Sequence, residues 1–454
     1  MSLNTDQPSL LAELIEESKF FVGAEDLDVN CIHIENSEFF IDKITIGEKV
    51  YEYKNSHGFR DETERKRYAK RYTKLALYLS LSDYLKTDLP WGALTGIRPV
   101  KFAYNEGENW RDVMKNQMRV SDKKLDIVEK IIDSQKPVYT ANAGGSDLFV
   151  GIPFCPTRCS YCSFVSNLIS KEKRLDEYVD ALCKEIAAAK PLINRLNSVY
   201  VGGGTPVSLP LPLLEKILSA IGSPDCEFTV EAGRPDCIDD EVLSLLKKYG
   251  VTRVCVNPQT FNDKTLELIG RKHTADDIRV KYALTKKYGF DVNTDLIAGL
   301  PQETFEDFKY SVDQAIALSP EDVTVHTLSL KNGSKLKEEN DRLCAGEIEK
   351  MVDYASDALL ANGYVPYYTY RQKYMAGNLE NTGYAKNGKI CAYNIDVMEE
   401  ISDNVACGAN AVSKKLFDGG ERIERYGAPK DIATYVAKID RIIDEKNKLF
   451  SNNR

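Results

Sequence analysis

The stretch Asp147-Leu-Phe-Val-Gly-Ile-Pro-Phe-Cys-Pro-Thr-Arg-Cys-Ser-Tyr-Cys162 places three cysteines within eight residues, directly after an apolar run typical of a buried strand. Thiolates from one short loop suit an iron–sulfur cluster or a zinc ion, because both bind soft sulfur ligands. Four protein ligands close a structural zinc site, whereas three leave one coordination position open for chemistry. Because no fourth Cys or His stands at ligand spacing nearby, the pattern favours an open site on Cys155, Cys159 and Cys162.

Strand-like and helix-like segments alternate along the chain after this point. Apolar runs typical of strands occur at residues 148–154, 198–201, 227–231, 253–257, 292–297 and 323–328. Segments with helical periodicity lie between them, at 172–190, 211–221, 239–249, 275–288 and 303–318. About six such units predict an α/β fold whose parallel sheet curls into a full or partial barrel. Functional groups of such barrels gather at the C-terminal ends of the strands, where the cysteine loop stands.

The flanking regions have other patterns. Residues 1–145 combine a helical segment near 10–20, strand-like runs at 31–34, 39–46 and 49–54, and long helices near 61–85 and 121–134. Residues 341–454 contain a helix near 347–362, a stretch rich in Tyr, Asn and Gly, and an amphipathic helix near 431–448. We therefore expect three parts: an N-terminal α+β accessory domain (1–145), the barrel (146–340) and a lid-like region on the substrate side (341–454).

Composition narrows the class of protein. The 454 residues are 43% hydrophobic and 28% charged, as in an ordinary globular protein. A net charge of -9 argues against a sequence-independent nucleic-acid binder. The eleven cysteines are mostly scattered singly, which is typical of reduced thiols in the cytoplasm rather than a disulfide scaffold. The N-terminus lacks a signal-peptide pattern and no apolar stretch is long enough to span a bilayer, so we expect a cytoplasmic protein.

Polar residues also end the later predicted strands. Gly202-Gly-Gly-Thr-Pro206 follows the second strand, Glu231 ends the third, Asn257 and Gln259 end the fourth, and Asp295 lies in the fifth. A run of glycines lets backbone N–H and C=O groups approach a small polar ligand closely. Glycine clusters are also common turns, and each carboxylate could form a local ion pair instead. Their shared position at strand ends favours a functional role.

Together these motifs carry a resemblance to a known family. Cys155-x3-Cys159-x-Tyr-Cys162 after a first strand resembles the signature of radical S-adenosylmethionine (SAM) enzymes. Gly203-Gly-Thr-Pro206, Gly270-Arg-Lys-His273 and Asp295-Leu-Ile-Ala-Gly-Leu-Pro301 are similar to stretches of the oxygen-independent coproporphyrinogen III oxidase-like group. The N-terminal domain with Thr95-Gly-Ile-Arg-Pro99, and residues 370–384, resemble the HemZ-type branch of that group.

The resemblance implies a radical SAM (β/α)6 partial barrel with a [4Fe–4S] cluster on Cys155, Cys159 and Cys162. SAM would bind the open iron, and an electron from a low-potential donor would cleave it to methionine and a 5′-deoxyadenosyl radical that takes hydrogen from the substrate. The implied SAM contacts are Gly203, Gly204 and Thr205 at the methionine amino group, Glu231 at the ribose, Arg271 at the carboxylate, and Gln259 and Asp295 at the remaining polar edges. Phe149 stands where the family has a tyrosine near the cluster and SAM.

The resemblance also bears on the substrate. In the oxidases, two propionates of coproporphyrinogen III are decarboxylated to vinyl groups. Those oxidases carry a further cysteine two residues after the third ligand, where this chain has Phe164. Related members without that cysteine include haem chaperones. The expected partner is therefore coproporphyrinogen III or haem, and another radical SAM reaction on a tetrapyrrole, such as methyl transfer, is a third possibility.

Several further side chains are candidates for contacts with a tetrapyrrole. A molecule with four carboxylates needs cations, and Arg98, Lys101, Arg371 and Lys373 could supply them, although each could equally be a solvated charge. Five tyrosines could line a flat pocket or lie in the core: Tyr364, Tyr367, Tyr368, Tyr370 and Tyr374. His326 is more typical of a hydrogen-bonded barrel histidine than of a ligand. Cys391 and Cys407 could approach the site from the C-terminal region, or be buried apolar residues.

Overall fold

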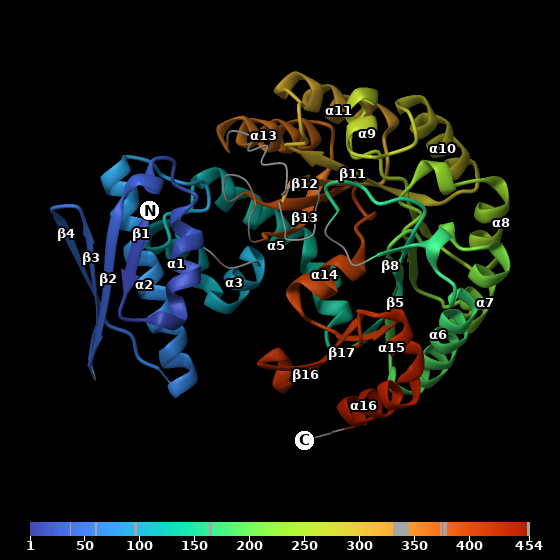
Figure 1. Cartoon of the computed structure of the whole chain (residues 1–454), viewed down its shortest axis with the longest axis horizontal. Helices are drawn as coiled ribbons and strands as arrows, with labels where there is room; N and C mark the ends of the chain where they lie inside the picture. Colours follow the sequence, from blue (N-terminus) through green and yellow to red (C-terminus); the bar gives the residue numbers. More distant parts are fainter. Residues whose placement is uncertain are drawn as a thin grey trace. The chain divides into compact units, whose positions relative to one another are not determined.

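The computed structural model describes residues 1–36, 38–59, 61–94, 98–162, 166–329, 345–372, 375 and 379–451. The chain forms two compact units (Figure 1). The first comprises Met1–Glu129 and Arg371–Leu379, and the second comprises Lys130–Tyr370 and Glu380–Arg454. None of the helices in the described ranges combines the length and the hydropathy that a bilayer crossing requires.

The first unit is an α+β arrangement. Its four-stranded sheet has the order β1-β2-β3-β4, with bounds Ser2–Thr5, Asp28–Glu35, Phe40–Ile46 and Lys49–Asn55. In β3, buried residues alternate with more exposed ones, because only one face of the sheet packs against α1 (Leu11–Ser18) and α2 (Glu62–Leu85). Helix α2 begins where the Asp61 side chain accepts a hydrogen bond from the Glu64 backbone N–H. Helices α3 (Pro99–Glu106) and α4 (Trp110–Asp112) follow.

Six parallel strands form the centre of the second unit. Their bounds are β5 (Ser146–Ile152), β8 (Leu196–Gly203), β9 (Glu227–Val230), β10 (Arg253–Cys255), β11 (Asp291–Ala298) and β12 (Asp322–Thr327). Each lies within a few residues of a strand expected from the sequence, so the α/β prediction is confirmed. Strand β5 is buried at all but one position, as expected for a parallel strand covered on both faces.

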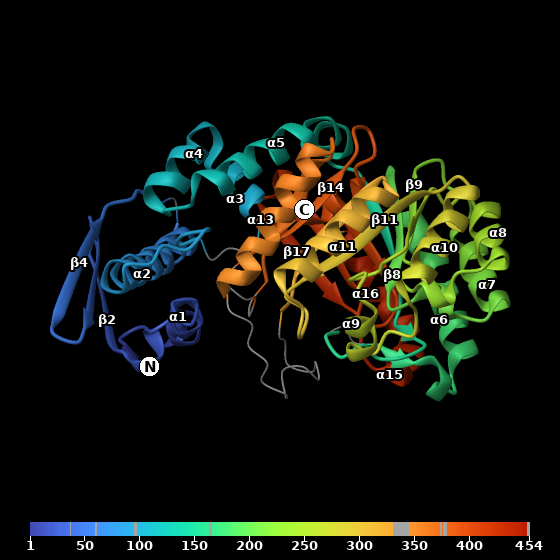
Figure 2. The same ribbon diagram turned by 90° about the horizontal axis from the view of Figure 1, so that it is seen from above.

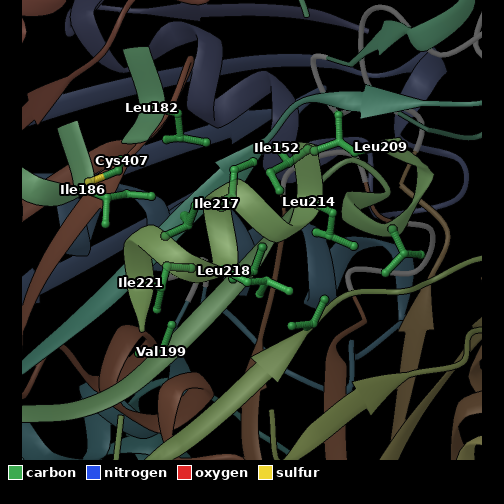
Figure 3. Close-up of a cluster of buried hydrophobic side chains, with 14 of the residues drawn as sticks. Ile152, Leu182, Ile186, Val199, Leu209, Leu214, Ile217, Leu218, Ile221 and Cys407 are labelled. Atoms are coloured by element: carbon green, nitrogen blue, oxygen red, sulfur yellow. The ribbon is translucent and has the colours of Figure 1, made fainter. Parts of the chain in front are cut away.

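Helices cover the outer face of these strands (Figure 2). They are α6 (Leu175–Ala189), α7 (Leu211–Ile221), α8 (Asp240–Lys248), α9 (Asp263–Leu268), α10 (Ala275–Lys287) and α11 (Phe305–Leu318). Helices α10 and α11 each begin with a capping box, in which a threonine and an aspartate three residues later bond to each other's backbone N–H. Figure 3 shows apolar side chains of α6, α7, β5 and β8 packed into one core.

The C-terminal residues extend the same sheet. Strands β13 (Val365–Tyr370) and β14 (Asn381–Ala385) continue it beyond β12, and β15 (Asp403–Cys407), β16 (Val412–Phe417) and β17 (Arg422–Gly427) continue it beyond β5. The expected separate lid at 341–454 is therefore replaced by strands that share the sheet and core of the second unit. The remaining helices are α13 (Ala345–Ala361), α14 (Ala392–Glu399), α15 (Ile432–Ala437) and α16 (Ile439–Ser451).

The two units also divide elsewhere than at the expected boundary of 145. Helix α5 (Asp122–Asn142) crosses the division, and its last turns belong to the second unit. There the Gln135 side chain donates hydrogen bonds to the Tyr367 carbonyl and to Glu399, both at 2.9 Å. The Asn142 side chain donates to Asp396 at 2.7 Å. These buried polar contacts fix the second half of α5 to the sheet of the second unit.

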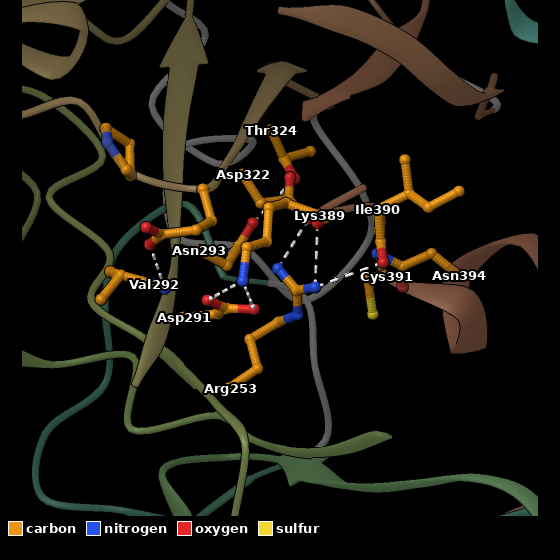
Figure 4. Close-up of polar contacts among 12 residues, drawn as sticks. Arg253, Asp291, Val292, Asn293, Asp322, Thr324, Lys389, Ile390, Cys391 and Asn394 are labelled. Atoms are coloured by element: carbon orange, nitrogen blue, oxygen red, sulfur yellow. Dashed lines mark hydrogen bonds and ion pairs between the residues drawn. The ribbon is translucent and has the colours of Figure 1, made fainter. Parts of the chain in front are cut away.

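A layer of charged residues closes the N-terminal ends of the parallel strands (Figure 4). Arg253, the first residue of β10, is buried and donates to the carbonyl of Lys389 at 2.9 Å. The Lys389 ammonium in turn contacts Asp291, the first residue of β11, at 2.9 Å. Cys391 donates to Glu227 at the start of β9, at 3.2 Å. This layer lies at the opposite end of the strands from the cysteine loop.

A second buried ion pair attaches the C-terminal helix to the sheet. Lys446 of α16 is 2% exposed and donates to Glu185 of α6 at 2.9 Å and to the Ala406 carbonyl of β15 at 2.9 Å. Glu185 also accepts hydrogen bonds from the Gly408 backbone N–H at 2.7 Å and from the Tyr435 hydroxyl. Because water reaches none of these groups, removing one partner leaves a buried charge without compensation.

We predict that Lys446→Met lowers the free energy of unfolding by about 3–5 kcal/mol, because Glu185 would remain charged in an apolar surrounding. Urea unfolding of the protein followed by circular dichroism measures the change. The exposed Lys448, which pairs with Glu445 across one helical turn, is the matched control. Its change to Met should cost about 1 kcal/mol or less. Equal unfolding midpoints for the two variants would show that the buried pair does not hold α16.

Candidate functional site

The three cysteines lie at the C-terminal end of β5, as the sequence predicted. Cys155 ends the short strand β6 (Phe154–Cys155), and its sulfur accepts a hydrogen bond from the Thr205 hydroxyl at 3.6 Å. The loop that follows is bonded to a distant segment of the chain, because the Ser160 backbone N–H donates to the Ile269 carbonyl at 3.1 Å. All three thiols are partly exposed, and none of the described cysteines forms a disulfide.

The glycine run after β8 lies directly against the cysteine strand. The Gly204 backbone N–H donates to the Ile152 carbonyl at 2.9 Å, and the Thr205 N–H donates to the Phe154 carbonyl at 2.7 Å. A Cβ atom on Gly204 would come within 2.5 Å of the Phe154 carbonyl oxygen, so only glycine permits this approach. The predicted loop and the predicted cysteine strand are therefore one structural element.

Glu231 faces the same loop. Its carboxylate accepts hydrogen bonds from the Gly203 backbone N–H at 3.1 Å and from the Tyr200 hydroxyl at 2.6 Å. Burial raises the pKa of Glu231 to about 6, although these two hydrogen bonds oppose the rise. A carboxylate with a pKa near neutrality can accept hydrogen bonds from ligand hydroxyls above pH 6 and is protonated below it.

An aromatic stack supports Tyr200. The rings of Tyr200 and Tyr393 are stacked with centroids 4.4 Å apart, and Phe149 is stacked 6.3 Å from each of them. Tyr393 comes from α14, which is nearly two hundred residues beyond Tyr200 in the sequence. Sequence reasoning identified Phe149 but missed both tyrosines, because no local pattern links them.

A second polar group forms at the ends of β10, β11 and β12. The Asp295 carboxylate accepts hydrogen bonds from Asn257 at 2.6 Å and from Asn293 at 2.9 Å. His326 Nε2 lies 3.7 Å from Asp295, so this histidine faces the polar group and does not act as an isolated core residue. The Gln259 backbone N–H bonds to the Asp295 carbonyl at 3.0 Å, and Gln259 adopts a left-handed conformation with φ +69°.

Arginines line the outer side of the cysteine loop. Arg271 is buried, and its guanidinium donates to the Gly233 carbonyl at 3.3 Å. Burial disfavours its charge, but the neighbouring Tyr161 and Cys159 keep the pKa of Arg271 above its ordinary value. Arg234, which the sequence did not single out, donates to the Thr157 hydroxyl at 2.6 Å and lies 3.9 Å from the Cys159 sulfur.

The residues of this site fit a polar cofactor. Buried atoms with no hydrogen-bond partner in the described part of the chain include Arg271 Nε, Asn257 Oδ1, Ser160 Oγ and both ring nitrogens of His273. Buried polar atoms are usually paired, so the unpaired atoms of Arg271 and His273 beside the cysteine loop fit a polar ligand, whereas others, such as those of Arg253, lie elsewhere. Burial, followed by the charge of Arg271, lowers the pKa of His273 to about 4, and its imidazole is therefore neutral at pH 7.

The three thiols suit an iron–sulfur cluster by their chemistry, although their sulfur atoms are not arranged as metal ligands in this structure. In the described ranges, no three His, Cys, Asp or Glu side chains are arranged as metal ligands, so the three thiols share a loop without converging on one point. The donor set suits iron–sulfur ligation.

The other candidates from the sequence have surroundings of their own. Arg371 is buried in the first unit, where it donates to the Leu94 carbonyl and lies over the Trp91 ring. Cys391 lies in the charged layer at the opposite strand ends, and Cys407 lies beside Lys446.

Three of the candidate tyrosines, Tyr364, Tyr367 and Tyr368, are buried and hydrogen-bonded within the second unit. Tyr370 approaches His326. Arg98 and Lys101 belong to the first unit; Phe164, Lys373 and Tyr374 lie outside the described residues.

Comparison with known proteins identifies the family. The radical SAM superfamily matches residues 149–315. The oxygen-independent coproporphyrinogen-III oxidase-like protein HemZ of Bacillus subtilis is 35% identical over 79% of this chain and 76% of its own. The chain belongs to the HemZ family of radical SAM proteins. Radical SAM proteins use a [4Fe–4S] cluster and SAM, so the cofactor expectation is confirmed at the level of the family.

Two further proteins resemble parts of this chain. The heme chaperone HemW of Bacillus subtilis is 36% identical over 40% of this chain and 49% of its own. The structure of coproporphyrinogen III oxidase HemN from Escherichia coli, a radical SAM enzyme, covers 67% of this chain and 71% of its own, with a TM-score of 0.54. At 21% identity this likeness shows the fold alone, which is the radical SAM α/β fold expected from the sequence.

We predict that Gly204→Ala lowers both the stability of the loop and the amount of bound iron. The added methyl group must displace the Phe154 backbone, at a cost of about 1–3 kcal/mol, and would move Cys155 with it. Iron per chain after anaerobic reconstitution and the melting temperature of the apoprotein measure the two effects. Gly346→Ala is the control, because that position in α13 is open and alanine favours a helix. Wild-type iron content in Gly204→Ala would contradict the proposed close approach.

Proposed function

We propose that this protein is a SAM-dependent oxidoreductase that decarboxylates two propionates of coproporphyrinogen III, without oxygen, to give protoporphyrinogen IX. The observation that carries this proposal is the 35% identity with HemZ over 79% of the chain, which extends well beyond the radical SAM region itself. The thiol loop beside a polar, partly buried ligand site supports it. We place the protein in the reducing cytoplasm, where a low-potential donor can supply electrons.

Each residue of the site has a proposed task. Cys155, Cys159 and Cys162 hold the cluster, and the loop of Gly203, Gly204 and Thr205 receives the amino group of SAM. Glu231 accepts hydrogen bonds from the ribose, and Arg271 pairs with the methionine carboxylate. Gln259 and Asp295 orient the remaining polar edges, while Phe149 packs beside the site. When bound, the cluster and SAM together supply one-electron chemistry that removes hydrogen from an unactivated carbon.

A haem chaperone is the second candidate function. It is favoured by the 36% identity with HemW, which is confined to 40% of the chain. It is also favoured by Phe164, which stands where the oxidases of the family carry an additional cysteine. A chaperone would use the same cofactor site but would bind haem without turnover.

An anaerobic assay of the reconstituted protein with SAM and coproporphyrinogen III distinguishes these functions. Protoporphyrinogen IX and release of two molecules of carbon dioxide, quantified by mass spectrometry, support the oxidase. Stoichiometric haem binding without a decarboxylated product supports the chaperone, and a methylated tetrapyrrole would indicate a third reaction. Cys155→Ser is the matched control, because it removes one ligand of the cluster and should abolish turnover.

We predict that SAM binding weakens below pH 6, because protonation removes the acceptor that Glu231 offers to the ribose. With a pKa of about 6 for Glu231, affinity at pH 5 should fall about tenfold from its value at pH 8. Tyr200→Phe removes a hydrogen bond that stabilises the carboxylate, so its loss of affinity should begin at a higher pH. Equilibrium dialysis of labelled SAM at several pH values measures both curves.

The control for this titration is Tyr310→Phe, which removes an exposed hydroxyl that contacts only Arg279 among the described residues. This variant should follow the wild-type curve. If SAM affinity is constant between pH 5 and pH 8, or if Tyr200→Phe leaves the curve unchanged, Glu231 does not bind SAM as a carboxylate.

A further inference from the structure

We propose that Arg234 is a positioning residue that sets the reduction potential of the iron–sulfur cluster, through a guanidinium held against the Cys159 sulfur. This inference rests on the proposed role of Cys159 as a cluster ligand, and it concerns electron transfer to the cluster, whatever the substrate. No sequence motif described above includes Arg234.

The guanidinium of Arg234 is fixed on two sides. On one side, Nε and Nη2 donate to the two carboxylate oxygens of Asp236, at 3.0 and 2.8 Å. On the other side, Nη1 donates to the Thr157 hydroxyl at 2.6 Å and lies 3.9 Å from the Cys159 sulfur. A planar guanidinium that donates two hydrogen bonds to one carboxylate has little freedom to rotate. The N–H groups that face the cysteine loop are therefore held in place before a cluster binds.

The Arg234 side chain is also shielded from water. Arg234 is 3% exposed, and its side chain is covered more fully than that of Asp236. A charge that water does not screen acts strongly on neighbouring groups. Lysines and arginines on the surface of the same unit, such as Arg422 of β17, lack this property, since the Arg422 side chain is 44% exposed.

Among the described residues, the buried charges beside the cysteine loop do not balance one another. Arg234 and Arg271 are both buried beside it, and Asp236 is the carboxylate paired with Arg234. His273, which lies beside Arg271, is neutral at pH 7 and adds no charge. One positive charge is thus left over for the thiolates and the cluster that they would hold. Three thiolates around a cluster bring negative charge, so the arrangement is electrostatically complementary.

The sign of the effect follows from this complementarity. One-electron reduction adds a negative charge to the cluster, with no bond formed or broken and with the electron supplied by a low-potential donor. A fixed positive charge and an N–H directed at a ligand sulfur both stabilise the reduced form, and hydrogen bonds to sulfur are among the factors that set cluster potentials. Arg234 therefore makes the cluster easier to reduce.

A redox titration of the reconstituted protein, followed by electron paramagnetic resonance without substrate, tests this proposal. Arg234→Gln should lower the equilibrium constant for reduction about tenfold, which for one electron is a potential about 59 mV more negative. Arg422→Gln, which removes an exposed arginine at the sheet edge, should keep the wild-type potential. Iron and sulfide content are measured on every variant, so loss of the cluster is distinguished from a change in its potential.

Arg234→Lys keeps the positive charge but replaces the planar guanidinium with an ammonium group. It should lower the equilibrium constant for reduction of the cluster by about threefold, which is less than the effect of Arg234→Gln. If Arg234→Gln does not retain a full cluster, the titration of Arg234→Lys decides the question. A wild-type potential in the variant that retains its cluster overturns the proposal. Failure to find coproporphyrinogen turnover would overturn the proposed reaction but would leave these potentials unaffected.

Discussion

Two backbone hydrogen bonds, from Gly204 to Ile152 and from Thr205 to Phe154, hold the glycine run against the cysteine strand. They extend the parallel pairing of β5 with β8 into the two loops that follow these strands. The cysteine strand and the glycine run consequently cannot move independently. Glu231 then completes the arrangement, because its carboxylate bonds to the backbone N–H of Gly203 in the same run.

The two ends of the sheet use polar residues in different ways. At the N-terminal ends, Arg253, Asp291 and Glu227 find partners in the segment 389–391, and the resulting layer closes the sheet. At the C-terminal ends, several buried polar atoms of Arg271, Asn257 and His273 have no partner in the described part of the chain. Unpaired buried atoms occur at the N-terminal ends as well, on Arg253 and Asp322. What fits a ligand at the C-terminal ends is that the unpaired atoms of Arg271 and His273 lie beside the cysteine loop.

The sequence predicted those parts of the fold that depend on local patterns. Parallel strands covered on both faces appear as continuous apolar runs, and Thr274 and Thr304 mark helix starts through their capping boxes. Strands β13 to β17 were missed because short strands of mixed polar and apolar residues carry no such pattern, whether they pair antiparallel or, as β15 does with β5, in parallel. A single helix was expected at 431–448, because the helical periodicity continues through this segment. The structure divides it at Lys438 into α15 and α16.

The site shows the same division between local and tertiary information. Glu231 and Asp295 could be found from the sequence because one ends a predicted strand and the other lies within one. Arg234 could not, because its contacts with Thr157 and Cys159 join residues more than seventy positions apart. The stack of Tyr393 on Tyr200 joins positions that are still farther apart. The side chains that we propose tune the site thus depend on tertiary packing, whereas those proposed to bind its cofactor follow the topology of the sheet.

The choice between oxidase and chaperone must depend on residues outside the cofactor site. HemZ and HemW are almost equally identical to this chain, at 35% and 36%, but the first match extends over 383 residues and the second over 189. A region shared by an oxidase-like protein and a chaperone at equal identity cannot by itself determine which of the two activities follows. Because fold and cofactor are common to both, we expect the specificity of this protein to depend on residues other than the cluster ligands, including Phe164, two residues after Cys162.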